Sequence, residues 1–123
     1  MGDDAVILRG ASGDEAREVQ RATFYSTIHG AGRVMSRTEA KGRFNRKTGQ
    51  VKSAGRITAE MMRTWLERKG VELRGGDLDE APQAYRRLGE VLEAQGNTVA
   101  VTETLRPAAV AMAGKRDWDP YKD

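Results

Sequence analysis

The sequence predicts an α+β fold that mixes short strands with amphipathic helices. Apolar residues recur at helical spacing in some stretches and alternate with polar residues in others, without an internal repeat. The 123 residues are 38% apolar, which is enough for one modest core and too little for a two-domain enzyme. We therefore expect a single unit over residues 1–123, with a mobile loop at 44–56 and a tail at 115–123.

Three elements are predicted in the first third of the chain. Residues 5–9 form a short apolar run, which predicts a buried strand without an obvious partner. Residues 13–24 are acidic first and basic later, which favours a short helix. Ser36 and Glu39 fit the capping-box pattern, so a second helix should begin there and run to about Arg43.

Helices and strands should alternate again in the second half. Apolar residues at a spacing of four predict a helix over 57–69, which Gly70 ends. Pro82 suits the first turn of a further helix, whose apolar stripe runs from Tyr85 to Leu92. Strands are expected at 71–74 and 98–105.

Positive charge is concentrated in the segment 33–56, although the net charge of the chain is only +3. The segment has one acid, Glu39, and its eight basic residues are Arg33, Arg37, Lys41, Arg43, Arg46, Lys47, Lys52 and Arg56. Such a block predicts contact with a polyanion, such as RNA or the phosphates of a nucleotide. The alternative is a solvated loop that keeps the protein in solution.

Composition argues against a disulfide-bonded protein and against a membrane or secreted protein. The chain has no cysteine and one histidine, which rules out disulfides and thiolate metal ligands, so any metal site would need carboxylates or another chain. It has no apolar run of about 18 residues and no signal-peptide pattern at its beginning. We expect a cytoplasmic protein that does not contact a membrane.

The segment from Tyr25 to Arg33 is too glycine-rich for a helix or a central strand and should be a loop. Gly30 and Gly32 let backbone amides approach an anion closely. The His29 imidazole next to them could attack phosphorus while the following arginine offsets the developing charge. On spacing alone, a hydrogen-bonded turn histidine is the alternative.

This loop opens a longer stretch that resembles a known family. Residues 29–41 read His-Gly-Ala-Gly-Arg-Val-Met-Ser-Arg-Thr-Glu-Ala-Lys, which is similar to the signature of RtcB-type RNA-splicing ligases. The likeness continues at 79–85, at 105–107 (Leu-Arg-Pro) and at 119–123 (Asp-Pro-Tyr-Lys-Asp), whereas 44–60 match poorly. The resemblance implies the C-terminal portion of the larger RtcB-type fold.

The resemblance also implies a reaction. In that family the motif histidine attacks the α-phosphate of GTP with the help of manganese, and the GMP passes to an RNA 3′-phosphate. A 5′-hydroxyl then displaces the GMP and seals the strand, and a 2′,3′-cyclic phosphate is first opened. The residues implied here are His29 as nucleophile, Gly30, Ala31 and Gly32 around the nucleotide, and Arg33 and Arg37 on RNA phosphates.

Two further residues are implied at the guanine. Tyr85 would lie against the base, although its spacing to Leu92 equally suits a core stripe. Lys122 would be the lysine that contacts the guanine nucleotide near the family's C-terminus. Alignment on 105–107 instead places Met112 at that position, which leaves Lys122, Lys115 or neither in the role.

The chain departs from the family in what it lacks. The family's manganese ligands, a cysteine, an aspartate and several histidines, belong to a region upstream of anything present here. Residues 1–5 resemble the interior of the family, with Ala5 where relatives can carry serine. We therefore expect a fragment that needs the missing N-terminal part as a partner and that does not ligate RNA by itself.

Two other functions are compatible with the sequence. A non-catalytic RNA-binding module could use the basic segment 33–56, and a small structural protein could use the glycine loop only as a turn. Retention of the intact His-Gly-Ala-Gly-Arg motif favours the ligase, because RNA binding alone requires positive charge and not a particular imidazole.

Overall fold

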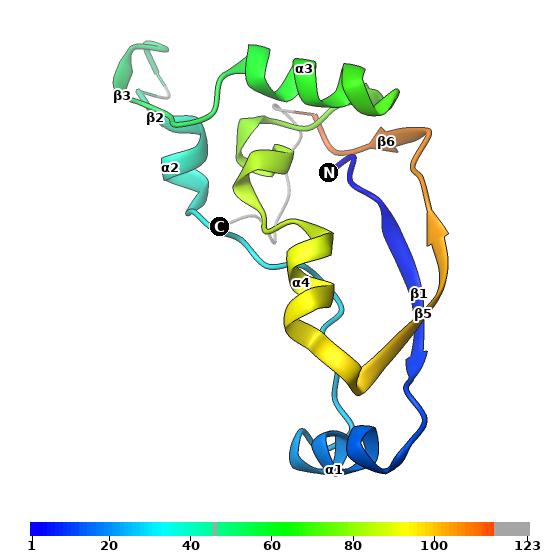
Figure 1. Cartoon of the computed structure of the whole chain (residues 1–123). Helices are drawn as coiled ribbons and strands as arrows, with labels where there is room; N and C mark the ends of the chain where they lie inside the picture. Colours follow the sequence, from blue (N-terminus) through cyan, green and yellow to red (C-terminus); the bar gives the residue numbers. More distant parts are fainter. Residues whose placement is uncertain (46, 115–123) are drawn as a thin grey trace. The chain divides into compact units, whose positions relative to one another are not determined.

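The computed structural model describes residues 1–45 and 47–114, and over these residues it confirms the mixed α+β fold (Figure 1). Backbone contacts group the chain into two units. The hairpin unit contains Met1–Gly2, Val34–Tyr85 and the described residues from Ala108 onward. The loop unit contains Asp3–Arg33 and Arg86–Pro107. No helix in the described part of the chain has the length and apolar character needed to cross a membrane.

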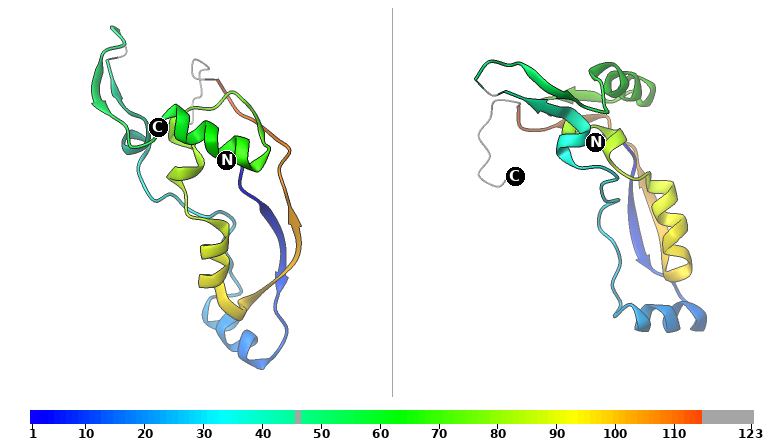
Figure 2. Two further views of the ribbon diagram at one scale, coloured as in Figure 1. Left: turned by 45° about the horizontal axis from the view of Figure 1, so that its top comes forward. Right: turned by 90° about the vertical axis from the view of Figure 1, so that its left-hand side faces the viewer.

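The loop unit is built on a two-stranded antiparallel ribbon. Strand β1 (Ala5–Gly10) pairs with β5 (Val99–Leu105), and the two lie side by side in every view (Figures 1 and 2). The sequence predicted both strands. The expectation that the first strand is buried was wrong, because its residues are exposed or half-buried. A ribbon of two strands leaves much of its surface open to solvent.

Two helices complete the loop unit. Helix α1 (Asp14–Ala22) follows the acidic-to-basic pattern, and it ends two residues earlier than predicted because Phe24 and Tyr25 adopt positive φ angles of 53° and 55°. Helix α4 (Leu88–Gln95) continues into a 3-10 turn, η3 (Gly96–Thr98). Gln20 ties these parts together, since its side-chain amide donates to the carbonyls of Ala11 (3.0 Å) and Thr98 (2.8 Å).

The hairpin unit has a small core of Ala40, Ile57, Ala81 and Ala84. Helix α2 (Arg37–Lys41) starts at the predicted capping box. It stops two residues before the predicted end, because Gly42 turns the backbone at a φ of 84°. Helix α3 (Ala59–Lys69) ends at Gly70 as predicted. Its predicted first residue, Ile57, lies before the helix and is buried in the core instead.

Residues 44–56 were predicted to be a mobile loop, and the structure instead has two paired strands in this segment, while its mobility stays a prediction. Strand β2 (Gly42–Phe44) pairs antiparallel with β3 (Val51–Ala54), and the β2–β3 hairpin stands out from the end of α2 (Figures 1 and 2). Every residue of β3 is exposed, which is why the strands show no apolar pattern that the sequence could reveal.

The helix predicted from Pro82 to Gly96 is present only in its second half. The chain forms 3-10 turns η1 (Leu78–Glu80) and η2 (Pro82–Ala84), then runs extended through Tyr85, and α4 begins only at Leu88. The predicted strand at 71–74 is β4 (Glu72–Arg74), which pairs parallel with β6 (Ala109–Ala111). The predicted tail at 115–123 lies outside the described residues.

The capping box of α2 gives the Glu39 carboxyl a testable titration. The pKa of Glu39 lies below its ordinary value, because the Ser36 backbone N–H donates to the carboxylate (2.9 Å) and the Ser36 hydroxyl lies beside it. A lowered folded-state pKa means that the stabilising contribution is present at neutral pH and is lost as the pH falls through that pKa. Acidification should therefore loosen the start of α2.

The Ser36→Ala variant should shift this titration. The substitution removes the hydroxyl and keeps the backbone donor, so the Glu39 pKa should rise part of the way to its ordinary value. An NMR titration of the Glu39 carboxyl measures the change. The neighbouring exposed Thr38→Ala variant serves as the control and should leave the pKa in place. An identical Glu39 titration in wild type and Ser36→Ala would refute this account of the cap.

Candidate functional site

The predicted loop around His29 is present in the loop unit. His29 and Gly30 are exposed, and Ala31 and Arg33 are half-buried. Gly32 has a φ of 77°, a backbone conformation that glycine adopts at little cost. The backbone N–H of Arg86 donates to the Gly32 carbonyl (3.0 Å), which fixes the end of the loop next to the residues before α4.

The His29 imidazole is solvent-exposed and has no hydrogen-bond or ion-pair partner among the residues that the structure describes. A turn histidine that serves a structural purpose would bond to a neighbouring backbone group. The described contacts therefore do not support the alternative of a hydrogen-bonded turn histidine. An exposed imidazole without a partner has its ring nitrogens available for a substrate.

A cavity of about 510 Å³ adjoins the loop, and all of its lining belongs to the loop unit. This volume is within the usual range of ligand pockets. Gly30 and Ala31 form one part of the lining. The remaining lining residues are Ile28, Arg86, Glu90, Val91, Ala94 and Gln95. The residues directly after His29 thus open onto a space that can accept a small molecule.

Two charged residues of this lining were missed by the sequence analysis. Arg86 lies close to the loop, since a Cβ atom added at Gly32 would be 3.2 Å from its Nη1 atom. A guanidinium at this position can donate to a phosphate oxygen, and the Glu90 carboxylate can accept from N–H groups. The sequence offered one signal for Arg86, its position directly after the family-like segment 79–85. This signal was missed, because Arg86 fell inside a helix that was predicted to be continuous.

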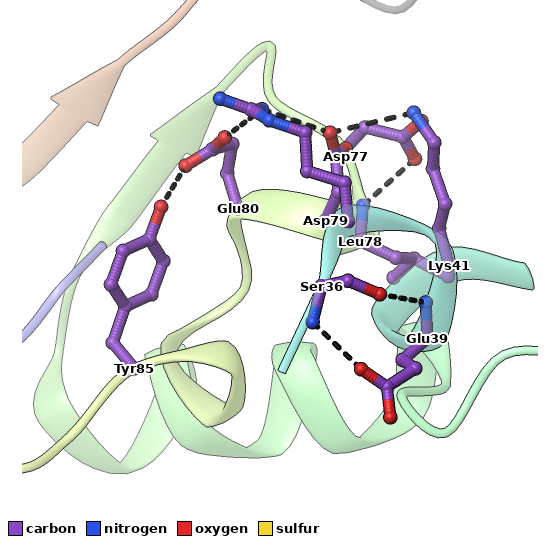
Figure 3. Close-up of polar contacts among 9 residues, drawn as sticks. Ser36, Glu39, Lys41, Asp77, Leu78, Asp79, Glu80 and Tyr85 are labelled. Carbon is purple, nitrogen blue, oxygen red and sulfur yellow. Dashed lines mark hydrogen bonds and ion pairs between the residues drawn. The ribbon is translucent and has the colours of Figure 1, made fainter. Parts of the chain in front are cut away.

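Arg37, the second predicted phosphate ligand, lies in the hairpin unit and contacts carboxylates. Its Nη1 atom is 3.2 Å from Asp79 Oδ2 and pairs closely with Glu80 Oε1 (Figure 3). Asp79 is fully buried, and its Oδ2 atom also lies 3.4 Å from the Lys41 ammonium. An RNA phosphate at Arg37 would compete with two carboxylates that are already in place.

These contacts hold Arg37 in its charged form. Burial acts to lower the pKa of Arg37, but the hydrogen bond to Asp79 and the negative charges of Asp79 and Glu80 outweigh it, so the pKa is raised. Glu80 links this network to Tyr85, whose hydroxyl donates to the second carboxylate oxygen (Figure 3). The network therefore joins α2, η1 and the extended segment after η2.

Tyr85 is half-buried against the core cluster and is not part of a helix, so its predicted place in a helical apolar stripe was wrong. Its hydroxyl bond to Glu80 fixes the direction of the ring. Its predicted contact with guanine stays a prediction. Lys122 and Lys115, the candidates for the guanine-contacting lysine, lie outside the described residues.

The described residues do not supply a manganese centre. No three side chains of histidine, aspartate or glutamate gather there in a way that could hold a metal ion. Asp79 and Glu80, a buried and a half-buried acid of the hairpin unit, are engaged with Arg37 and Tyr85. The donor set of this part of the chain therefore does not fit the metal that the family resemblance implies.

Comparison with known proteins agrees with the motif. A family model described as tRNA-splicing ligase RtcB matches residues 1–113. The chain is 36% identical over 106 residues to the RNA-splicing ligase RtcB of Escherichia coli K12, covering 86% of this chain and 21% of that protein. It is 35% identical over 98 residues to the RNA-splicing ligase RtcB of Mycobacterium bovis, covering 76% and 18%.

A more distant relative is archaeal. The tRNA-splicing ligase RtcB of Archaeoglobus fulgidus is 32% identical over 117 residues, which cover 90% of this chain and 20% of that protein. The chain thus spans about a fifth of the length of the curated relatives it matches.

Proposed function

We propose that this chain carries the nucleotide-accepting histidine of an enzyme that joins RNA ends with GTP, because the chain belongs to the RtcB family of tRNA-splicing ligases. The RNA ends are a 3′-phosphate or 2′,3′-cyclic phosphate and a 5′-hydroxyl. The observation that carries the proposal is the exposed, unpartnered imidazole of His29 beside a loop that opens onto a cavity of about 510 Å³.

The proposed reaction has three steps after any cyclic phosphate has been opened by water. A ring nitrogen of His29 attacks the α-phosphorus of GTP, a nitrogen–phosphorus bond forms, and the bond to the departing pyrophosphate breaks. The GMP group then moves from the imidazole to the oxygen of an RNA 3′-phosphate. The 5′-hydroxyl of the other strand attacks that phosphate, forms the new phosphodiester and releases GMP.

The surroundings of His29 suit the first of these steps. Gly30, Ala31 and Gly32 present backbone without bulky side chains, which lets amides approach the phosphates. The Arg86 guanidinium lies against Gly32 and can stabilise the charge that develops on phosphate oxygens. We assign Arg86 this role in addition to the residues of the motif.

The other residues of the motif have separate proposed roles. Arg33 is the proposed contact for an RNA phosphate next to the nucleophile. Arg37 has the same proposed role, but its pairing with Asp79 and Glu80 suits it better to holding α2 in place. Tyr85 and Lys122 are proposed to contact the guanine.

The proposal includes a partner. Because the chain spans about a fifth of its relatives and its described residues do not form a manganese site, the metal would be held by residues outside this chain. We propose that the chain acts together with an N-terminal part that supplies these ligands. By itself it should bind RNA without sealing it.

Transfer of label from GTP tests the proposal. The chain is mixed with the remaining part of the Escherichia coli relative, manganese and GTP labelled at the α-phosphate. The wild-type chain should become labelled through a bond that is stable to alkali and broken by acid, as expected for a nitrogen–phosphorus bond. The His29→Ala variant should take up no label, because it lacks the attacking nitrogen.

A matched control separates loss of chemistry from loss of fold. Ser26→Ala changes an exposed residue of the same loop outside the motif and should label as the wild type does. Equal labelling of the wild type and His29→Ala would remove His29 from the reaction. RNA binding by a chain that is never labelled would favour the non-catalytic RNA-binding module based on the segment 33–56.

A further inference from the structure

The β2–β3 hairpin is held by close backbone approaches at its base and by hydrogen bonds near its turn. At its base, the backbones of Gly42 and Gly55 approach so closely that a Cβ atom at Gly42 would lie 2.4 Å from the Ser53 carbonyl oxygen. At Gly55 an added Cβ would lie 2.4 Å from the Ala40 carbonyl oxygen. In the turn, Asn45 N–H donates to the Gln50 carbonyl (2.8 Å), and the Asn45 side chain accepts from Lys47 N–H (3.0 Å).

The hairpin gains little from burial in this chain. All four residues of β3 are exposed, and Phe44, the aromatic residue of β2, is 49% exposed. A two-stranded hairpin with both faces open to water has marginal stability of its own. Exposed apolar surface that does not contribute to the core can mark a contact with another molecule.

Charge indicates what that molecule is. The segment 42–54 contains no acid. Arg43, Lys47 and Lys52 are exposed and have no ion-pair partner among the residues that the structure describes. The cations of α2 in the same basic segment differ, because Arg37 and Lys41 face the carboxylates of Asp79 and its neighbours. The uncompensated charge of the segment is therefore concentrated on the hairpin.

Apolar surface accompanies these cations. Phe44 and Val51 are partners across the two strands and are 49% and 58% exposed. An exposed aromatic side chain among cations is the arrangement with which proteins bind single-stranded nucleic acid, since bases stack on the ring and phosphates meet the charges. An acidic protein partner would require the cations but would not require the aromatic ring.

We infer that the β2–β3 hairpin is an RNA-binding arm that holds a single-stranded part of the substrate. Arg43, Lys47 and Lys52 contact backbone phosphates, and Phe44 stacks on a base. The inference rests on the proposed function, because it takes RNA as the substrate. It adds a contact that the His-Gly-Ala-Gly-Arg motif does not include.

A salt series with the 123-residue chain tests the inference. The probe is a single-stranded RNA of mixed sequence, and the variant is Arg43→Gln, Lys47→Gln, Lys52→Gln. The matched control is Arg63→Gln, Arg68→Gln, Arg74→Gln, which removes the same charge from exposed residues of α3 and β4. Loss of three phosphate contacts should reduce the slope of log affinity against log salt by about two units in the hairpin variant.

A second variant tests the stacking contact. Phe44→Ala keeps the charges, so it should weaken RNA binding roughly tenfold while leaving the salt slope unchanged. Circular dichroism of each variant verifies that the fold is retained. Equal slopes for the hairpin variant and the control variant would overturn the inference. The inference would also be overturned if the 123-residue chain bound vesicles of anionic lipid or polyglutamate with an affinity equal to that for RNA.

The outcomes distinguish this inference from the proposed function. Arg43, Lys47 and Lys52 do not line the cavity beside His29, so the triple hairpin variant should still take up label from GTP when the remaining part of the relative is supplied. A hairpin variant that labels normally and binds RNA as the wild type does refutes the arm alone. A chain that binds RNA through the hairpin and is never labelled refutes the ligase and leaves the arm in place.

Discussion

Replacing Gly75 with alanine should lower the free energy of unfolding of the hairpin unit by about 3 kcal/mol. Gly75 has a φ of 75°, and a Cβ atom there would lie 1.9 Å from the Met112 carbonyl oxygen. The backbone fixes the position of Cβ, and the carbonyl oxygen is itself a backbone atom, so neither can move aside by a side-chain rotation. Relief of the clash requires the strands β4 and β6 to separate at this end.

The separation would cost backbone hydrogen bonds as well. Met112 N–H donates to the Arg74 carbonyl, and Gly76 N–H donates to the Ala113 carbonyl, each at 2.9 Å. Urea unfolding measures the loss of stability, and hydrogen exchange of these two amides reports its location. Exchange in Gly75→Ala should be much faster at both positions than in the wild type.

Gly70→Ala is the matched control for Gly75→Ala. Gly70 also has a positive φ, 67°, but an added Cβ would meet no atom within 4 Å. This variant should lose only about 1 kcal/mol, the cost of the backbone conformation. If the two variants were equally stable, the close approach at Gly75 would have no energetic importance.

Replacing Asp79 with asparagine should destabilise the hairpin unit by about 2–3 kcal/mol. The substitution keeps the shape of the side chain and removes the charge that Arg37 and Lys41 share. Loss of one partner from a fully buried pair can cost more than this. Here Arg37 and Lys41 are 38% and 31% exposed, so water and Glu80 can partly compensate them.

An exposed ion pair provides the comparison for Asp79→Asn. Glu72 and Arg74 lie 3.0 Å apart with side chains 62% and 80% exposed, so Glu72→Gln should cost less than about 1 kcal/mol. Urea unfolding of both variants at neutral pH makes the measurement. A loss for Asp79→Asn no larger than that for Glu72→Gln would show that burial of the Asp79 carboxylate adds nothing to its pairing.

Local signals made much of the fold predictable. The capping box at Ser36 and Glu39, and Gly70 at the end of α3, were read correctly because each acts within one helical turn. The β2–β3 hairpin could not be found in this way. Its strands have no buried face, and its base depends on the backbone of Gly55 reaching residues near position 41.

The candidate site was likewise predictable only where its residues are close together in the sequence. The glycine loop around His29 is a continuous motif and was visible in the sequence. Arg86 and the cavity that it lines were not, because they depend on where α4 begins. The carboxylates that hold Arg37 lie more than forty positions away, with a separation of 42 for Asp79, so charge counting along the segment 33–56 overstated its free charge.

The strand pairing of the loop unit has a consequence for synthesis on the ribosome. The carbonyl of Ile7 in β1 accepts from the hydroxyl of Thr102, which is translated 95 residues later. At bacterial or eukaryotic elongation rates, the first strand of the ribbon waits roughly 5–20 s for its partner. During that interval its apolar side chains are available to chaperones, so interruption of translation before β5 should mark the nascent chain for capture and degradation.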